Sequence, residues 1–414
     1  MRKVVLFGTG KVYSVFMQLY DRNKLEIVGL SDNNKQKQGL MLDGVKIYAP
    51  NSVRDLAADW IVITTAYVEE VKAQLLELGI EENKIKNFYS IYKKLSPFED
   101  ENWINVLKED YCIALTAQKN RQQEVQVKQL QQKSLFLEAK NFINSMPERI
   151  NSLEEVEFQV FSQFGEDGII QWLIRNAKIA NKTFVEFGAS DYVESNTRFL
   201  LMNNNWSGLI IDGSKDNIEK VKEWDSFWKY DLTAINEFIT KDNINRIIMD
   251  AGFSGDLGIL SLDIDGNDYW VLCAITCVKP CILICEYNNT YGDEKKVTIP
   301  YDENFFKTDK HYSNLYWGAS LGAFKDYAEK NGYYYFGSNS AGHNAFFVRK
   351  DCIDSSLIPM QSSTFVVSKY RESIDLNGKF NFLSGNKKLE ALRDMDLVNL
   401  ETGRIEKISN IYCL

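Results

Sequence analysis

Two short apolar stretches, each followed by a glycine turn and an acidic residue nearby, constrain the fold more than any other part of the chain. The first, residues 183–191 (TFVEFGASD), opens with β-branched and aromatic residues that predict a buried strand, and Gly188 then lets the backbone turn sharply. The second, residues 208–213 (GLIIDG), predicts a neighbouring strand that ends at Asp212. An acid at the end of a second strand is well placed to accept hydrogen bonds from the hydroxyls of a ribose. Because the pyrophosphate fingerprint GxGxxG is missing here, the pattern predicts an α/β sheet that binds an adenosine ligand without a diphosphate.

The composition indicates an ordinary soluble protein with more than one domain. A chain of 414 residues exceeds the size of a single hydrophobic core, and its net charge of −9 argues against a nucleic-acid partner. No apolar run approaches the length of a membrane span. Since residues 1–5 (MRKVV) lead directly into a strand and lack the apolar segment of a signal peptide, we expect a cytoplasmic protein.

Residues 1–95 predict a Rossmann-like domain built on a parallel sheet. Apolar strands are expected at residues 3–7, 25–30 and 60–65. Gly8 and Gly10 follow the first strand and Asp32 follows the second, but Tyr13 stands at the third glycine position of the dinucleotide fingerprint. The layout resembles the small Rossmann-like domains attached to bacterial sugar-modifying enzymes, which implies a nucleotide-sugar site at Gly8, Gly10 and Asp32. The alternative is a structural or oligomerising domain.

Residues 96–153 are polar and helix-favouring, and we expect them to form helices that join two domains. Apolar side chains recur here at Val125, Val127, Leu130 and Leu135. Because they do not keep a heptad spacing for long, a spacer is favoured over a short dimerising coiled coil, and a homo-oligomer stays open. The predicted fold class is therefore α/β, with two Rossmann-like parallel-sheet domains joined by a helical linker.

The remaining region, residues 154–414, carries the densest polar cluster and ends in an arm that begins near Asp351. Asp263 and Asp265 follow the apolar run GILSL, and Glu286 follows the run ILIC. Because parallel strands end at the same edge of a sheet, these three acids predict an oxygen-rich pocket. Such carboxylates either share a proton or hold a hard cation such as Mg²⁺. The alternative is that they cap the following helix and bind solvent.

Three further polar residues are expected to contribute to the ligand pocket. Gln163 lies in FSQFGEDG, just before a predicted helix, and this segment can shape one wall. Asn196 lies near the start of the helix after the Gly188 turn, where it can bond the ligand or cap the helix. Asp231 is expected to end a short third strand, where its side chain would meet the adenine amino group.

These motifs together resemble the FkbM-type family of class I S-adenosylmethionine-dependent methyltransferases. The similarity runs from about residue 161 to about residue 349 and rests on SQFGEDG, FVEFGASD, WSGLIIDGS, LSLDIDGNDYW, CEYN, YWGASLGAF and AGHNAFFV. It implies S-adenosyl-L-methionine as the cofactor, with Glu186 and Gly188 along its methionine and ribose. It also implies that Asp212 holds the ribose hydroxyls and that Asp263 sits beside the methyl sulfonium.

Two features of this resemblance concern the cradle of the cofactor and a metal. Asp191 stands where the family often has a second glycine. The DIDGND and EYN motifs are also similar to those of magnesium-dependent sugar O-methyltransferases of antibiotic pathways. This similarity implies a metal held by Asp263, Asp265 and Glu286, although this chain has Glu-Tyr-Asn where those enzymes have a paired Asp.

Transfer of a methyl group to a hydroxyl needs a base, and the candidates are His343 and, as an alternative, Asp265. His343 lies in a loop between two strand-like runs. The hypothesis is a methyltransferase that acts on a sugar hydroxyl in a surface polysaccharide or in its nucleotide-sugar precursor. The alternatives are a non-catalytic sugar-nucleotide-binding or scaffold protein, and a nucleotide-sugar-modifying enzyme that works through the N-terminal domain.

Overall fold

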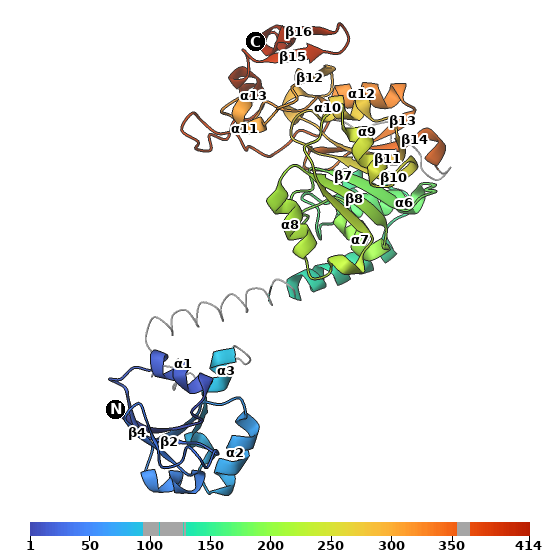
Figure 1. The fold of residues 1–414 in the computed structure, drawn as a ribbon. Helices are drawn as coiled ribbons and strands as arrows, with labels where there is room; N and C mark the ends of the chain where they lie inside the picture. The colour runs from blue at the N-terminus through green and yellow to red at the C-terminus, as the bar shows by residue number, and fades with distance from the viewer. Residues whose placement is uncertain (94–106, 108–126, 128–129, 354–364) are drawn as a thin grey trace. The chain divides into compact units, whose positions relative to one another are not determined.

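The computed structural model describes residues 1–93, 107, 127, 130–353 and 365–414 (Figure 1). These residues form two compact units, Met1–Gln131 and Gln132–Leu414, and each unit has its own sheet and its own apolar core. Helices and mainly parallel strands build both units, which confirms the predicted fold class of two Rossmann-like α/β domains.

The predicted linker lies largely outside the described residues, and so does Val125. Residues 130–145 are helical. The side chains of Val127, Leu130 and Leu135 are exposed. Because exposed apolar side chains suit either a spacer or a dimerising face, the choice between these two stays a prediction.

The first unit contains a six-stranded sheet with the order β3-β4-β2-β1-β5-β6. Its elements are β1 (Arg2–Phe7), α1 (Lys11–Leu19), β2 (Leu25–Ser31), β3 (Met41–Leu42), β4 (Val45–Tyr48), β5 (Trp60–Ile63), α2 (Val68–Glu77), β6 (Ile85–Asn87) and α3 (Phe88–Lys93). β1 pairs in parallel with β2 and β5, so the three predicted strands are confirmed. Val4 and Val5 of β1 point to opposite faces and are both fully buried, because a central parallel strand is covered on both faces.

The second unit contains a seven-stranded sheet with the order β13-β14-β11-β10-β7-β8-β9. Its strands are β7 (Thr183–Phe187), β8 (Ser207–Asp212), β9 (Leu232–Asn236), β10 (Gly255–Leu262), β11 (Val278–Glu286), β13 (Tyr333–Ser338) and β14 (Asn344–Arg349). The helices packed with this sheet are α6 (Glu166–Asn176), α7 (Arg198–Asn204), α8 (Lys215–Glu223), α9 (Ile244–Asp250), α10 (Asp268–Ala274) and α12 (Leu321–Lys330). The neighbouring strands β11, β10, β7, β8 and β9 run parallel to one another, and β14 is antiparallel to both of its neighbours, β11 and β13.

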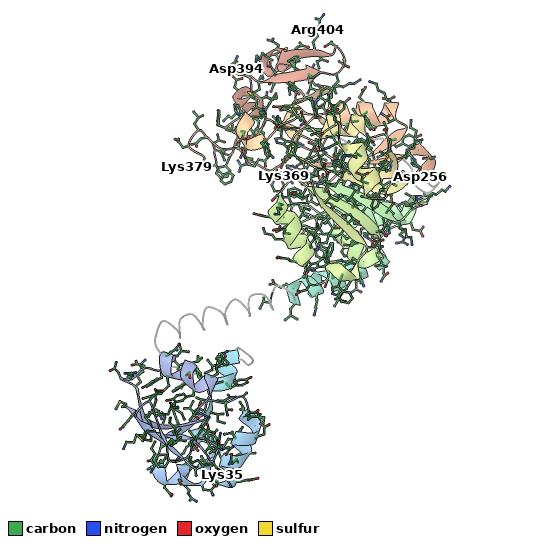
Figure 2. The ribbon with its side chains drawn as sticks, in the orientation of Figure 1. Lys35, Asp256, Lys369, Lys379, Asp394 and Arg404 are labelled. Atoms are coloured by element: carbon green, nitrogen blue, oxygen red, sulfur yellow. The ribbon has the colours of Figure 1, made fainter. Side chains whose placement is uncertain are left out.

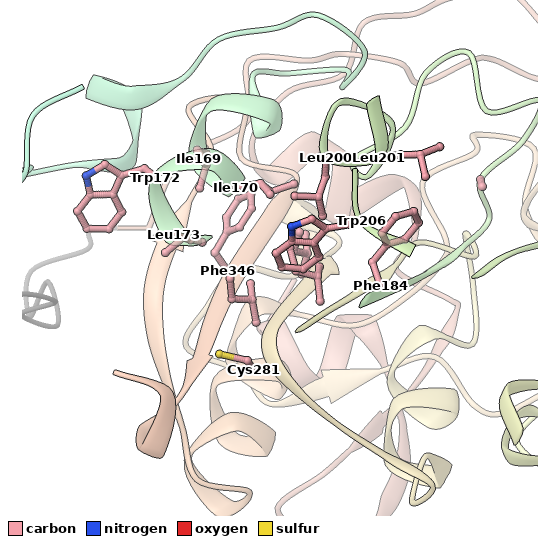
Figure 3. Close-up of a cluster of buried hydrophobic side chains, with 14 of the residues drawn as sticks. Ile169, Ile170, Trp172, Leu173, Phe184, Leu200, Leu201, Trp206, Cys281 and Phe346 are labelled. Carbon is pink, nitrogen blue, oxygen red and sulfur yellow. The ribbon is translucent and has the colours of Figure 1, made fainter. Parts of the chain in front are cut away.

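Two apolar layers lie on opposite faces of this second sheet. On one face, Phe184 of β7 packs in a cluster with Trp172 of α6, Leu200 of α7 and Phe346 of β14 (Figure 3). On the other face, the next residue of β7, Val185, belongs to a cluster that includes side chains of α9, α10 and α12. Successive residues of a strand point to opposite faces, so one short apolar run supplies both layers.

The C-terminal arm contributes β15 and β16, which join β12 in a small antiparallel sheet with the order β12-β15-β16. Its elements, with the short helices around them, are β12 (Val297–Thr298), α11 (Lys307–Lys310), α13 (Asn386–Ala391), β15 (Asp396–Asn399), β16 (Arg404–Lys407) and α14 (Ile408–Tyr412). The 3₁₀ helices found among the described residues are Pro50–Leu56, Glu82–Lys84, Leu153–Val156, Phe227–Lys229, Asn289–Tyr291 and Lys350–Cys352.

Charged side chains and apolar side chains separate as expected for packed α/β units. The charged residues labelled in Figure 2, which are Lys35, Asp256, Lys369, Lys379, Asp394 and Arg404, are all exposed. None of the helices within the described residues reaches the length and hydropathy that a membrane crossing requires.

Candidate functional site

The carboxyl ends of β7, β8 and β10 meet at one edge of the second sheet, because β7 pairs in parallel with both of the other strands. A cavity of about 490 Å³ lies at this edge. That volume falls within the range of small-molecule sites. Gly188, Asp212, Asp263 and Asp265 all line the cavity, so four of the residues singled out in the sequence share one site.

The turn after β7 has no room for a side chain at Gly188. The backbone φ of this residue is +68°, and a Cβ atom here would lie 1.7 Å from the carbonyl oxygen of Asp263. Two non-glycine residues of the same turn, Ser190 and Tyr192, also have left-handed φ values of 49° and 59°. The two left-handed residues therefore flank Asp191, the position at which the family that this motif resembles often has a second glycine.

Asp212 ends β8, and three donors hold its carboxylate in place. Oδ2 accepts a hydrogen bond from the backbone N–H of Ser190 at 2.9 Å. Oδ1 accepts from the backbone N–H of Ser214 at 2.8 Å and from the side-chain amide of Asn217 at 3.2 Å. A carboxylate fixed in this way can accept hydrogen bonds from ribose hydroxyls without reorganising.

Glu186 is not among the residues that line this cavity, and its expected place along the cofactor stays a prediction. Its buried carboxylate accepts hydrogen bonds from the Ser195 hydroxyl at 2.6 Å and from the backbone N–H groups of Asn196 and Thr197 at 2.9 and 3.2 Å. Burial raises the pKa of Glu186, while these donors act in the opposite direction. Glu186 therefore holds the loop before α7 in place.

Three other residues expected at the cofactor are also not among those that line this cavity. Asp231 precedes β9 instead of ending it, and its carbonyl accepts from the N–H of Gly208 at 2.9 Å, at the start of β8. It is therefore at the amino edge of the sheet, opposite the cavity. The side chain of Asn196 donates to the Ser261 hydroxyl at 3.1 Å. Gln163 lines a separate cavity of about 760 Å³.

Two aromatic side chains at the cavity are absent from the sequence-based prediction. Phe238 lies just beyond β9 and Phe306 lies just before α11, and both line the cavity. Their ring centroids are 5.4 Å apart, and the rings are 40% and 55% exposed. Exposed rings beside an acidic ribose position offer a stacking surface to a planar base. The correct end of β9, at Asn236, would have pointed to Phe238.

The three acids predicted to form an oxygen-rich pocket do come together. One carboxylate oxygen from each of Asp263, Asp265 and Glu286 lies within 4.8 Å of the other two. The side chains of Asp263 and Glu286 are half-buried, whereas that of Asp265 is exposed. Burial, followed by the charge of a neighbouring acid, raises the pKa of both Asp263 and Glu286.

A lysine that the sequence did not single out enters this acid cluster. The Nζ atom of Lys307, in α11, lies 2.8 Å from Oδ1 of Asp265. Burial alone would lower the pKa of Lys307, but the charges of Asp265 and Glu286 outweigh it and raise the pKa above its ordinary value. The ammonium is therefore charged at neutral pH. Asp265 is engaged in this ion pair, which makes it a weaker candidate for the base.

His343 lies next to the same cluster. Its Nδ1 is 4.0 Å from Oε1 of Glu286, its Nε2 is 3.1 Å from the Ser368 hydroxyl, and its ring stacks on Phe164 with centroids 5.0 Å apart. Burial, followed by the positive charges of two nearby lysines, lowers the pKa of His343 to about 4. The imidazole is therefore neutral near pH 7, and the same shift makes it a weaker proton acceptor than a solvent-exposed histidine.

In the first unit, the residues expected at a ligand lie at the ends of β1 and β2. Gly8 has a φ of +104°, and Gly10 precedes α1 with open space where a side chain would be. The carboxylate of Asp32 accepts hydrogen bonds from the N–H of Thr9 at 3.2 Å and from Nζ of Lys37 at 3.1 Å. These contacts do not test the expected nucleotide-sugar site, which stays a prediction.

Comparison with known proteins gives a family match for the first unit. Residues 1–86 match the family model described as C2185-like, N-terminal. A search of curated proteins finds no match to the chain.

Solved structures resemble parts of the chain at low identity. RSP, a Rex-family repressor, covers 23% of this chain at 14% identity with a TM-score of 0.17, and the chain spans 59% of that protein. UDP-D-quinovosamine 4-dehydrogenase from Vibrio fischeri covers 27% at 18% identity with a TM-score of 0.18, and 97% of its own chain is spanned. An S-adenosylmethionine-dependent methyltransferase from Clostridium acetobutylicum ATCC 824 covers 44% at 9% identity with a TM-score of 0.29, and 90% of its own chain is spanned. Similarity at this level carries no functional assignment, so function has to be argued from the site.

Proposed function

We propose that the second unit, Gln132–Leu414, is an S-adenosyl-L-methionine-dependent methyltransferase that methylates a sugar hydroxyl. The observation that supports it most is that Gly188 and Asp212, on neighbouring strand ends, line one cavity together with Asp263. A side-chain-free turn and a fixed carboxylate suit the ribose of an adenosine. The exposed ring pair beyond β9 suits its base.

The same cavity disfavours a dinucleotide and favours a cationic ligand. The N–H of Gly188 is donated to the carbonyl of Ile211 at 3.0 Å, so this turn does not direct that amide at a pyrophosphate. The carboxyl groups at this edge of the sheet, those of Asp212, Asp263, Asp265 and Glu286, outnumber the Lys307 ammonium, which disfavours a phosphate and favours a positive group. Cavity size, ribose acid and wall charge together fit S-adenosyl-L-methionine, which carries a sulfonium and no phosphate.

When bound, this cofactor supplies an activated methyl group, and the protein has to hold the acceptor hydroxyl and take its proton. Within the described residues, Oε2 of Glu286 is buried and has no hydrogen-bond partner. It can therefore accept a hydrogen bond from the acceptor hydroxyl. His343 is neutral and lies 4.0 Å from the other oxygen of Glu286, so it can receive the proton. We favour His343 over Asp265 as the base, because Asp265 is paired with Lys307.

The sugar acceptor is the finer part of the proposal. It comes from the sequence resemblance, and the two forms considered are a surface polysaccharide and its nucleotide-sugar precursor. Of the aromatic residues that precede α12, Tyr316 and Trp317 are buried in an apolar cluster, whereas Tyr312 is 42% exposed and available to stack on a sugar face. Mass spectrometry of surface glycans from a strain without this protein tests the acceptor: one methyl increment should be lost from a sugar. Unchanged glycans would reject the polysaccharide as the acceptor.

Calorimetric titration of the full chain with S-adenosyl-L-methionine tests the cofactor. We expect one site per chain and a Kd raised about ten- to hundredfold in Asp212→Ala, because hydrogen bonds to a charged group contribute about 1.5–3 kcal/mol. Asp216→Ala is the matched control, since Asp216 is exposed in the first turn of α8 and does not line the cavity. No binding by the wild type, or equal Kd values for both variants, would reject the proposed site.

A further inference from the structure

Lys307 reaches the acid cluster from a distant part of the sequence and is held there from two sides. Its side chain is 19% exposed, and its Nζ lies 4.6 Å from the centroid of the Trp317 ring as well as 2.8 Å from Oδ1 of Asp265. A lysine enclosed to this extent is costly unless an opposite charge or an aromatic face compensates it. Both kinds of partner are present, so an ion pair and an aromatic ring hold the ammonium in place.

Asp265 holds the Lys307 ammonium from an unfavourable backbone conformation. Its φ is 54°, in the left-handed region that most non-glycine residues avoid. From that conformation its carboxylate contacts Lys307. Strain of this kind persists only where surrounding contacts compensate it, and it concentrates at functional sites.

We propose that the Lys307 ammonium is the resident cation of the Asp263, Asp265 and Glu286 cluster and takes the place that a divalent metal holds among similar acids. The expected Mg²⁺ fits this arrangement poorly. One oxygen of Asp265 already accepts a hydrogen bond from the ammonium, and the ammonium already supplies positive charge to these carboxyl groups. Mg²⁺ binds carboxylates through their oxygens, so it would have to displace the Lys307 ammonium from Asp265.

Two consequences follow for the proposed reaction. Methyl transfer at this site does not require a divalent metal, and Lys307 is a positioning residue because it acts through Asp265. This inference concerns the site of the proposed function. The experiment that tests it measures cation binding, so the result does not depend on whether the chain transfers a methyl group.

Mn²⁺ alone is the probe, and electron paramagnetic resonance of the free ion is the readout. Lys307→Met removes the cation from the acid cluster, so we expect this variant to bind one Mn²⁺ per chain, at least about tenfold more tightly than the wild type does. At the concentrations where the variant binds, the wild-type chain should leave the Mn²⁺ signal unchanged. Adding Asp263→Asn to Lys307→Met should abolish that binding. Lys307→Arg retains the positive charge and should behave as the wild type.

Lys310→Met is the matched control, because Lys310 lies in the same short helix but pairs with Asp302 outside the cluster. It should not create a Mn²⁺ site. Wild-type binding of Mn²⁺ that Asp263→Asn removes would overturn the inference, and so would a folded Lys307→Met that binds none. The wild-type measurement decides the matter even where Lys307→Met fails to fold.

Discussion

At the scale of single residues, Glu166 and Asp167 show that a buried acid can have a structural task close to a candidate site. Oδ2 of Asp167 accepts from the backbone N–H groups of residues 160–162 at 2.7, 2.7 and 3.0 Å. Glu166 accepts from the side-chain amides of Asn339 and Asn344 at 2.6 and 2.8 Å. Both acids thus hold the segment that leads into α6 against its neighbours.

Asp167 gives stability a specific pH dependence. Burial is the largest influence on it and raises its pKa from 3.8 to about 6. Because the folded-state pKa lies above the unfolded one, this contribution is complete below a pH of about 4 and is lost as the pH rises through about 6. We expect the free energy of unfolding of the wild type, relative to Asp167→Asn, to fall by about 3 kcal/mol between about pH 4 and about pH 7 in urea denaturation. Asp216→Asn should follow the wild type, and parallel profiles for wild type and Asp167→Asn would contradict this assignment.

At the scale of secondary-structure elements, strand ends with a clear apolar-to-polar boundary could be predicted from the sequence. β7, β8, β10 and β11 are apolar runs that stop at a glycine or an acid. Because neighbouring parallel strands end at one edge, the sequence placed Gly188, Asp212, Asp263 and Glu286 close together, and the structure agrees.

The elements without such a boundary could not be predicted. β9 is an edge strand whose side chains are alternately buried and exposed, so no continuous apolar run marks where it begins and ends. For this reason the prediction that Asp231 ends this strand is wrong. Because β9 ends at Asn236, the residues beyond it that line the cavity are Glu237 and Phe238. Lys307 gives no local signal at all, because its partner Asp265 lies 42 residues earlier and only the tertiary fold joins them.

The loops that follow β9 and precede α11 should provide the base-binding part of the cofactor site. We expect Phe238→Ala and Phe306→Ala each to raise the Kd for S-adenosyl-L-methionine about five- to hundredfold, because one stacking face contributes about 1–3 kcal/mol. Calorimetry measures this. Trp228→Ala is the control, since Trp228 is 79% exposed and does not line the cavity. Equal affinity in all three variants would show that the base binds elsewhere.

At the scale of the whole molecule, each unit completes its own sheet and its own core. The apolar clusters of the first unit draw on residues between Val4 and Leu107. Those of the second unit draw on residues between Phe136 and Leu414. Units that each bury a contiguous core are able to fold separately. The sequence predicted two such units from the repeated strand–helix alternation, since each alternation needs a core of its own.

The fragment Gln132–Leu414 should therefore fold alone and keep the cofactor site. Gly188, Asp212 and the acid cluster all belong to it, and their supporting hydrogen bonds come from residues of the same unit. We expect a single cooperative unfolding transition and a Kd for S-adenosyl-L-methionine within about threefold of the full chain, a difference below about 1 kcal/mol. The same fragment with Asp212→Ala controls for non-specific heat. A fragment that folds but binds more than about tenfold more weakly would mean that the first unit contributes to this site, because the folded fragment retains every cavity residue named above.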